Sequence, residues 1–118
     1  MRLTSDDTYQ AILRFLESEY ADSKSDDLAG LLGAMQFKQE GETMDPAIMH
    51  DWINLSERRD LTVSDARLLA AEFLSKYGNL MNSKDLCDIA GSLLDGSKNM
   101  ERRHKWDSAI NSIVEGKS

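Results

Sequence analysis

Proline, cysteine and long apolar runs are nearly missing from this chain of 118 residues, which has one proline, one cysteine and seven glycines. A single cysteine cannot form a disulfide within the chain, so nothing in the sequence suggests an oxidising compartment. No apolar run approaches the roughly 18 residues that span a bilayer. The first residues, MRLTSDDTYQ, lack the apolar segment of a secretory signal. We therefore expect a cytoplasmic protein that does not bind membranes.

Basic residues are too few in the first half of the chain to balance the acids. Residues 1–60 hold 13 Asp and Glu against 6 Lys and Arg, whereas residues 61–118 hold 8 of each, so the whole net charge of −7 belongs to the first half. Nucleic-acid binding needs a basic face, and this balance argues against it. An acidic half suits a basic protein partner, because opposite charges steer the encounter. The alternative is that the acidity only keeps the chain soluble.

With few helix breakers, the abundant Leu, Ala, Glu and Lys favour helices. Side chains that cap helix N-termini recur along the chain, and each precedes apolar residues at helical spacing. Thr4 and Asp7 form a variant of the capping box, and Pro46 follows the cap Asp45 at the first helical position. These signals predict six helices, at about residues 4–20, 25–35, 45–55, 62–74, 83–94 and 100–113.

One face of each predicted helix supplies the expected core, because its apolar residues recur every three or four positions. This core consists of Tyr9, Ile12, Leu13, Phe15, Leu16, Tyr20, Leu28, Leu31, Leu32, Met35, Ile48, Met49, Trp52, Ile53, Leu68, Leu69, Phe73, Leu74, Leu86, Ile89, Ala90, Leu93, Leu94, Trp106, Ala109, Ile110 and Ile113.

The pattern of the first three helices returns in the last three. At a constant offset of 58, eight positions between residues 3 and 31 are identical, and Trp52 corresponds to Trp106 at an offset of 54. We interpret residues 3–56 and 61–115 as an internal duplication. A three-helix unit of this length buries little by itself, so the two units should share one core. The sequence thus predicts an all-α fold, with residues 1–118 as a single domain in which six helices form one compact bundle.

Acidic residues gather at two junctions of the first unit. Asp22, Asp26 and Asp27 lie between the first two helices, and four further acids follow before and within the third: Glu40, Glu42, Asp45 and Asp51. Helix N-termini and solvated turns attract such residues anyway, which is one interpretation. The other is that the acids form one patch that binds a partner.

Motifs for catalysis or metal binding are weak. Glu101 and His104 have an E-x-x-H spacing, but a di-iron bundle needs a second such motif and further carboxylates, and Arg102 and Arg103 lie between them. Cys87 falls within an apolar pattern and is expected to be a small buried residue. We therefore expect neither an enzyme nor a cofactor or metal; an enzyme or metal protein built on Glu101 and His104 is the weakest alternative.

Two segments, FLESEYADSKSDDLAGLLGAMQ and EGETMDPAIMHDW, carry a family resemblance. The pattern resembles small acidic immunity proteins of bacterial contact-dependent growth inhibition systems, over about residues 9–55. The matching positions are Phe15, Tyr20, Ser25, Asp26, Asp27, Leu31, Leu32, Gly33, Gly41, Asp45, Pro46, Ala47, Asp51 and Trp52.

The resemblance implies a non-catalytic inhibitor that covers the active site or substrate path of one toxin domain. Many such toxins act on nucleic acid and have basic active-site surfaces, which an acidic antidote would match. Tight complexes add buried apolar anchors to a charged rim, and Tyr20, Met44 and Trp52 are the candidates, although Trp52 also suits the core. The alternative is a helical adaptor or regulatory protein for another basic partner. We expect the protein itself to be a monomer.

Overall fold

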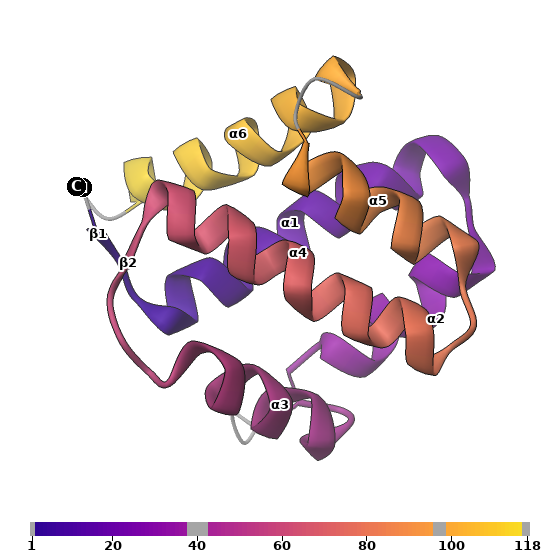
Figure 1. The fold of residues 1–118 in the computed structure, drawn as a ribbon, viewed down its shortest axis with the longest axis horizontal. Helices are drawn as coiled ribbons and strands as arrows, with labels where there is room; N and C mark the ends of the chain where they lie inside the picture. Colours follow the sequence, from indigo (N-terminus) through magenta and orange to yellow (C-terminus); the bar gives the residue numbers. More distant parts are fainter. Residues whose placement is uncertain (1, 38–42, 96–98, 117–118) are drawn as a thin grey trace.

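Helices make up most of residues 2–37, 43–95 and 99–116, the part of the chain that the computed structural model describes (Figure 1). The predicted all-α fold is confirmed, and two very short strands that the sequence did not predict pair with each other. In chain order the elements are β1 (Arg2–Leu3), α1 (Ser5–Ser23), α2 (Asp26–Met35), α3 (Pro46–Ser56), β2 (Leu61–Thr62), α4 (Val63–Leu80), α5 (Lys84–Leu94) and α6 (Met100–Gly116).

Local capping starts these helices where the sequence predicts it. The Asp7 amide donates to Thr4 Oγ1 at 3.0 Å and the Thr4 amide donates to the Asp7 carboxylate at 2.9 Å, which completes the capping box of α1. Asp45, Thr62 and Ser83 each accept a hydrogen bond from the first turn of their helices. Ser25 also precedes its helix, but its hydroxyl makes no such bond.

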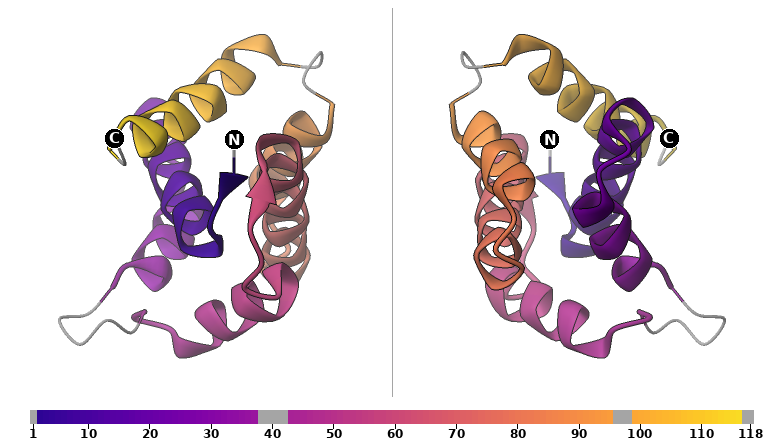
Figure 2. Two further views of the ribbon diagram at one scale, coloured as in Figure 1. Left: turned by 90° about the vertical axis from the view of Figure 1, so that its left-hand side faces the viewer. Right: turned by 90° about the vertical axis from the view of Figure 1, so that its right-hand side faces the viewer.

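Two packed pairs of helices enclose the core. Figure 2 shows α1 beside α6 on one side of the molecule and α4 beside α5 on the other, with α3 crossing between the two sides at one end. Fully buried aromatic side chains lie at the centre, and the apolar residues buried around them form one cluster. Most of the predicted core residues belong to this cluster, so the helical periodicity places the buried face of each helix correctly.

Several residues at the edges of the predicted apolar faces are not buried. Leu68 is 45 % exposed and Leu94 is 57 % exposed, and Tyr20, Met49 and Ile53 are half-buried. Leu68 and Leu94 line the same shallow hollow on the outer side of α4. Periodicity gives the direction of an apolar face, but the packing of neighbouring helices decides how far that face is covered, and this is where the core prediction is wrong.

Residues of the two halves meet their counterparts, defined here as the residues 58 positions later or, in the third helix of each half, 54 positions later. Leu3 and Leu61 are counterparts and pair directly in the antiparallel β1–β2 ladder. The rings of Phe15 and Trp106 lie 5.6 Å apart, edge to face, and so do those of Phe73 and Trp52. The third helix of each half therefore packs against the first helix of the other half.

Candidate partner-binding surface

Two acids near the C-terminal end of α1 bind cations of α6. Glu19 is 4 % exposed, and its carboxylate lies 3.0 Å from Arg102 Nε and 3.8 Å from Lys105 Nζ. Lys105 also forms an ion pair with Asp22. Burial works to lower the pKa of Lys105, but the hydrogen bond to Asp22 and the charge of Glu19 outweigh it and raise that pKa. Asp22, which the sequence analysis assigned to partner binding, thus already holds a cation of its own chain.

Asp51 has a similar internal role where α3 meets α4. Its carboxylate accepts a hydrogen bond from the Tyr77 hydroxyl at 2.5 Å and lies 3.2 Å from Lys76 Nζ. The hydrogen bond from Tyr77 and the charge of Lys76 lower the pKa of Asp51 below its ordinary value. Burial and the same hydrogen bond raise the pKa of Tyr77. This pair fastens α3 to α4.

Two further acids of the predicted set serve helix starts. The Ser83 hydroxyl donates to the Asp27 carboxylate at 2.6 Å, and Asp45 accepts the amide of Ala47 at 3.0 Å as the cap of α3. Asp26, in contrast, is exposed and makes no ion pair with the residues that the structure describes. Most of the predicted acids therefore have structural tasks, and Asp26 is the clearest exception.

The aromatic anchors of the predicted site are less accessible than its acids. Trp52 has no exposed surface, so the prediction that it contacts a partner is wrong and its alternative assignment to the core is right. Tyr20 is half-buried, and Lys24 Nζ lies 5.3 Å from the centre of its ring. The predictions for Glu40 and Glu42 fall outside the described residues.

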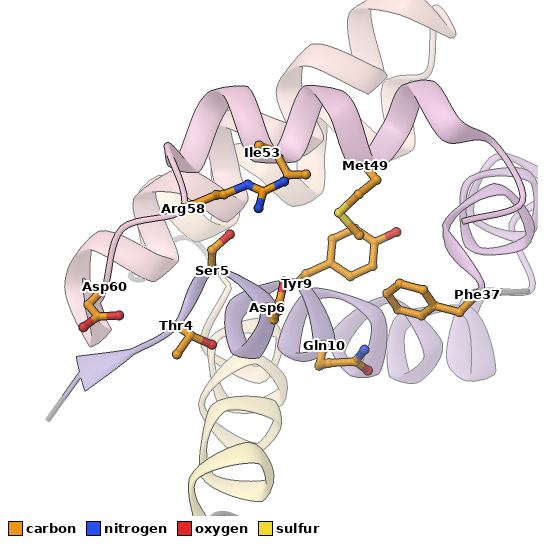
Figure 3. Close-up of a pocket in the computed structure, with 10 residues that line it drawn as sticks. All are labelled: Thr4, Ser5, Asp6, Tyr9, Gln10, Phe37, Met49, Ile53, Arg58 and Asp60. Carbon is orange, nitrogen blue, oxygen red and sulfur yellow. The ribbon is translucent and has the colours of Figure 1, made fainter. Parts of the chain in front are cut away.

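A groove with a volume of about 490 Å³ lies between α1 and α3, in the acidic half (Figure 3). Its two walls are tied together beneath it. Trp52 Nε1 donates to the Ser5 carbonyl at 3.0 Å, and the hydroxyl oxygens of Ser5 and Ser56 lie 2.8 Å apart. These buried hydrogen bonds hold the groove in a fixed shape, because breaking them would leave polar groups unsatisfied in the core.

One end of this α1–α3 groove is apolar. Tyr9, Phe37 and Met49 come together there (Figure 3). The rings of Tyr9 and Phe37 lie 5.5 Å apart, edge to face, and the Tyr9 hydroxyl donates to the Met35 carbonyl at 2.8 Å. Burial raises the pKa of Tyr9 above its ordinary value.

The rest of the groove is polar: Asp60 lies at the end away from Phe37, and Asp6 lies nearer the middle, close to Tyr9 and Gln10 in the view of Figure 3. Asp6 projects from the first turn of α1, and Arg58 and Asp60 come from the segment that follows α3 (Figure 3). All three are exposed, and neither carboxylate forms an ion pair within the described part of the chain. The groove therefore joins an apolar surface to carboxylates that remain open to a cation.

Phe37, at the apolar end of the groove, and Met44, in the segment that pairs with it, are both exposed. Phe37 is 41 % exposed and Met44 is 56 % exposed. A backbone bridge between Phe37 and Thr43, and a hydrogen bond of 2.8 Å from the Met44 amide to the Gln36 carbonyl, fix their positions. Met44 belongs to the predicted site, whereas the sequence analysis missed Phe37. The sequence does offer a clue to the exposure of Phe37, because this aromatic residue directly precedes the polar segment KQEGET.

The weak chemical motifs gain no support from the geometry. Among residues 2–37, 43–95 and 99–116, no three His, Cys, Asp or Glu side chains gather as metal ligands. Glu101 and His104 are both exposed on α6. Cys87 is half-buried rather than buried as predicted, with Sγ 3.7 Å from Asn79 Oδ1. Within the same described residues, no helix combines the length and apolarity that a membrane span requires.

Comparisons with protein-family models, with curated proteins and with solved structures give no match to this chain.

Proposed function

We propose that this protein is a non-enzymatic immunity protein, which binds one toxin domain, a nuclease with a basic active-site surface, and neutralises it. The observation that carries the proposal is the α1–α3 groove: a hollow with an apolar end that includes the exposed Phe37, in the half of the chain that holds the whole net negative charge. The resemblance of residues 9–55 to contact-dependent growth inhibition immunity proteins names the kind of partner.

The distribution of ion pairs supports this choice of surface. Cations of the second half pair with Glu19, Asp22 and Asp51, and Glu19 is in addition buried. Asp6, Asp26 and Asp60 keep exposed carboxylates without an ion pair among the described residues. A tight interface places a desolvated apolar anchor inside a charged rim, and Phe37 is the exposed apolar residue of the groove that supplies such an anchor.

The proposal includes the architecture: residues 3–56 and 61–115 are two copies of one three-helix unit. The Ser25 hydroxyl donates to Asp85 at 2.7 Å, and its counterpart Ser83 donates to Asp27, the counterpart of Asp85. Tyr9 donates to the carbonyl at the end of α2, and its counterpart Arg67 donates to the one at the end of α5. Together with the paired Phe and Trp rings, these contacts fit an approximate two-fold axis through the β1–β2 ladder.

Protection of living cells tests the proposed activity. The probe is the C-terminal domain of the secreted protein encoded immediately upstream of this gene, expressed from an inducible promoter in cells with and without this protein. We expect growth to stop without the protein and to continue with it, and the two chains to co-purify in equal amounts. Growth arrest in both strains, with no complex, would refute the immunity function.

Charge reversal tests the assigned half. The double substitution Asp6→Lys/Asp26→Lys should lower the association rate about tenfold and flatten its dependence on salt. The matched control is Asp65→Lys/Glu72→Lys in the second half, which changes the net charge equally at exposed positions. Equal losses in both variants would mean that only overall charge matters, and the surface assignment would fail.

A further inference from the structure

The α1–α3 groove differs sharply from the counterpart positions in the second half. Met49 and Ile53 line the groove, whereas their counterparts are Arg103 and Asp107, whose side chains form an ion pair at 3.3 Å along α6. The apolar wall of the groove is thus replaced by a charged pair that α6 satisfies within itself. Such a pair presents no apolar surface for a partner to bury.

Two further apolar residues of the groove are also replaced by charged ones, whereas the polar Ser5 and Gln10 correspond to Val63 and Leu68. The counterpart of Tyr9 is Arg67, whose guanidinium donates to the carbonyl of Leu93, and the counterpart of Phe37 is Asp95. Four positions are therefore aromatic or aliphatic in the first half and charged in the second. The Phe–Trp ring pair beneath is the same in both halves, so the contrast at these four positions does not come from a different core packing of the third helix.

We propose that the α1–α3 groove receives a partner segment that combines an aliphatic or aromatic side chain with an arginine or lysine. The apolar side chain packs against Tyr9, Phe37 and Met49, and the cation lies between the carboxylates of Asp6 and Asp60. This inference rests on the proposed function, and it specifies which chemistry of the toxin domain is bound.

Charge and size select this occupant. The groove holds two carboxylates and one guanidinium, a net charge of −1, within a half whose net charge is −7. Its volume of about 490 Å³ exceeds what one side chain fills. An exposed ion pair contributes little affinity by itself, so the apolar side chain anchors the segment while the cation sets orientation and association rate.

The main test replaces residues of the groove by their counterparts from the second half. Met49→Arg/Ile53→Asp introduces the pair found at Arg103 and Asp107, at half-buried positions where the new side chains can reach solvent. We expect this variant to keep the wild-type circular dichroism and to bind the upstream-encoded toxin domain about 100-fold more weakly. Phe37→Asp, which copies Asp95, should also weaken binding, whereas Leu94→Asp, at an exposed leucine outside the groove, should not.

The carboxylates have a separate test. Asp6→Asn/Asp60→Asn should weaken binding about tenfold and reduce its salt dependence, whereas Asp65→Asn/Glu72→Gln should change neither. Folded groove variants that bind as tightly as the wild type would overturn the inference while leaving the immunity function intact. Failure of the wild type to bind or protect would refute the immunity function instead.

A probe without any toxin completes the design. The isotope-labelled protein is titrated with N-acetyl-leucyl-arginine amide and, in parallel, with N-acetyl-leucyl-glutamate amide, and backbone amide shifts are followed by NMR. The arginine compound should shift amides along the α1–α3 groove more strongly than the glutamate compound, and the Met49→Arg/Ile53→Asp variant should lose that response. Equal shifts with both compounds, or shifts only elsewhere, would contradict the proposed occupant.

Discussion

Two interfaces of this protein share a plan but differ in polarity: α6 on α1, and α3 on α4. Each contains a fully buried tryptophan whose ring meets a phenylalanine edge to face at 5.6 Å. Around these rings the polar contacts diverge. Glu19 is held by two cations of α6 in the first interface, whereas its counterpart Tyr77 bonds to Asp51 in the second.

The two interfaces differ in how deeply they bury a charged side chain. In the α1–α6 interface an acid is 4 % exposed and needs its cations, because an unpaired buried carboxylate would be costly. In the α3–α4 interface the charged Asp51 is only half-buried, and a neutral hydroxyl takes the inner position. The same ring packing thus tolerates either a buried ion pair or a partly solvated one, and variants can measure how much each contributes.

The largest effect should come from Arg102→Met, which leaves Glu19 buried with only Lys105 nearby, at 3.8 Å. We expect a loss of about 3 kcal/mol in the free energy of unfolding and a fall in Tm of about 10 °C. Urea denaturation at neutral pH measures the first quantity. Adding Glu19→Leu should recover much of the loss, since no charge then remains buried, and a single variant within 1 kcal/mol of the wild type would contradict this account.

The second-largest effect should be the difference in stability between variants of the two buried tryptophans. Trp52 Nε1 donates to the Ser5 carbonyl, whereas Trp106 Nε1 has no acceptor among the described residues. Because both rings are fully buried and packed alike, Trp52→Phe should cost about 1 kcal/mol more than Trp106→Phe. Parallel urea denaturation of the two variants gives this difference directly. Equal losses, or a larger loss at Trp106, would show that the hydrogen bond adds nothing.

Tyr77→Phe should have a smaller effect that depends on pH. The lowered pKa of Asp51 means that its contribution is fully present above its ordinary pKa of 3.8 and is lost as the pH falls through the lower folded value. Without the Tyr77 hydroxyl this pKa rises toward normal, so the variant should lose about 1 kcal/mol at pH 7 and less below pH 3. Stability curves against pH measure the gap, and a gap that widens in acid would contradict the assignment.

The sequence predicted the helices well because their signals are local. Caps such as Thr4 and Asp45 act within one turn, and apolar spacing sets the buried face whatever lies opposite. The β1–β2 ladder escaped prediction, since two strands of two residues, 58 positions apart, carry no periodic signal.

The candidate site was harder to predict because the partners of its acids lie far away in sequence. Nothing near Asp22 in the chain points to Lys105, and nothing near Asp51 points to Tyr77. The acids that cluster in the sequence were therefore interpreted as one surface patch, although several of them bind residues of a neighbouring helix. Phe37 was missed for the opposite reason: its exposure depends on where α3 packs, which local pattern does not determine.

The last comparison concerns the reciprocal serines, and one of them, Ser25, should give the smallest effect. Ser83 is 2 % exposed, donates to Asp27 and accepts the Leu86 amide, so Ser83→Ala removes both a cap and a bond between the halves and should cost about 1–2 kcal/mol. The Ser25 hydroxyl makes only the more exposed bond to Asp85. Ser25→Ala should therefore lower the free energy of unfolding by only about 0.5 kcal/mol. Urea denaturation of both variants tests the ranking. Both serines make a bond across the halves and only Ser83 also caps its helix, so a larger loss for Ser25→Ala would mean that the cap of α5 adds nothing to stability and that the bond from Ser25 to Asp85 is the stronger of the two.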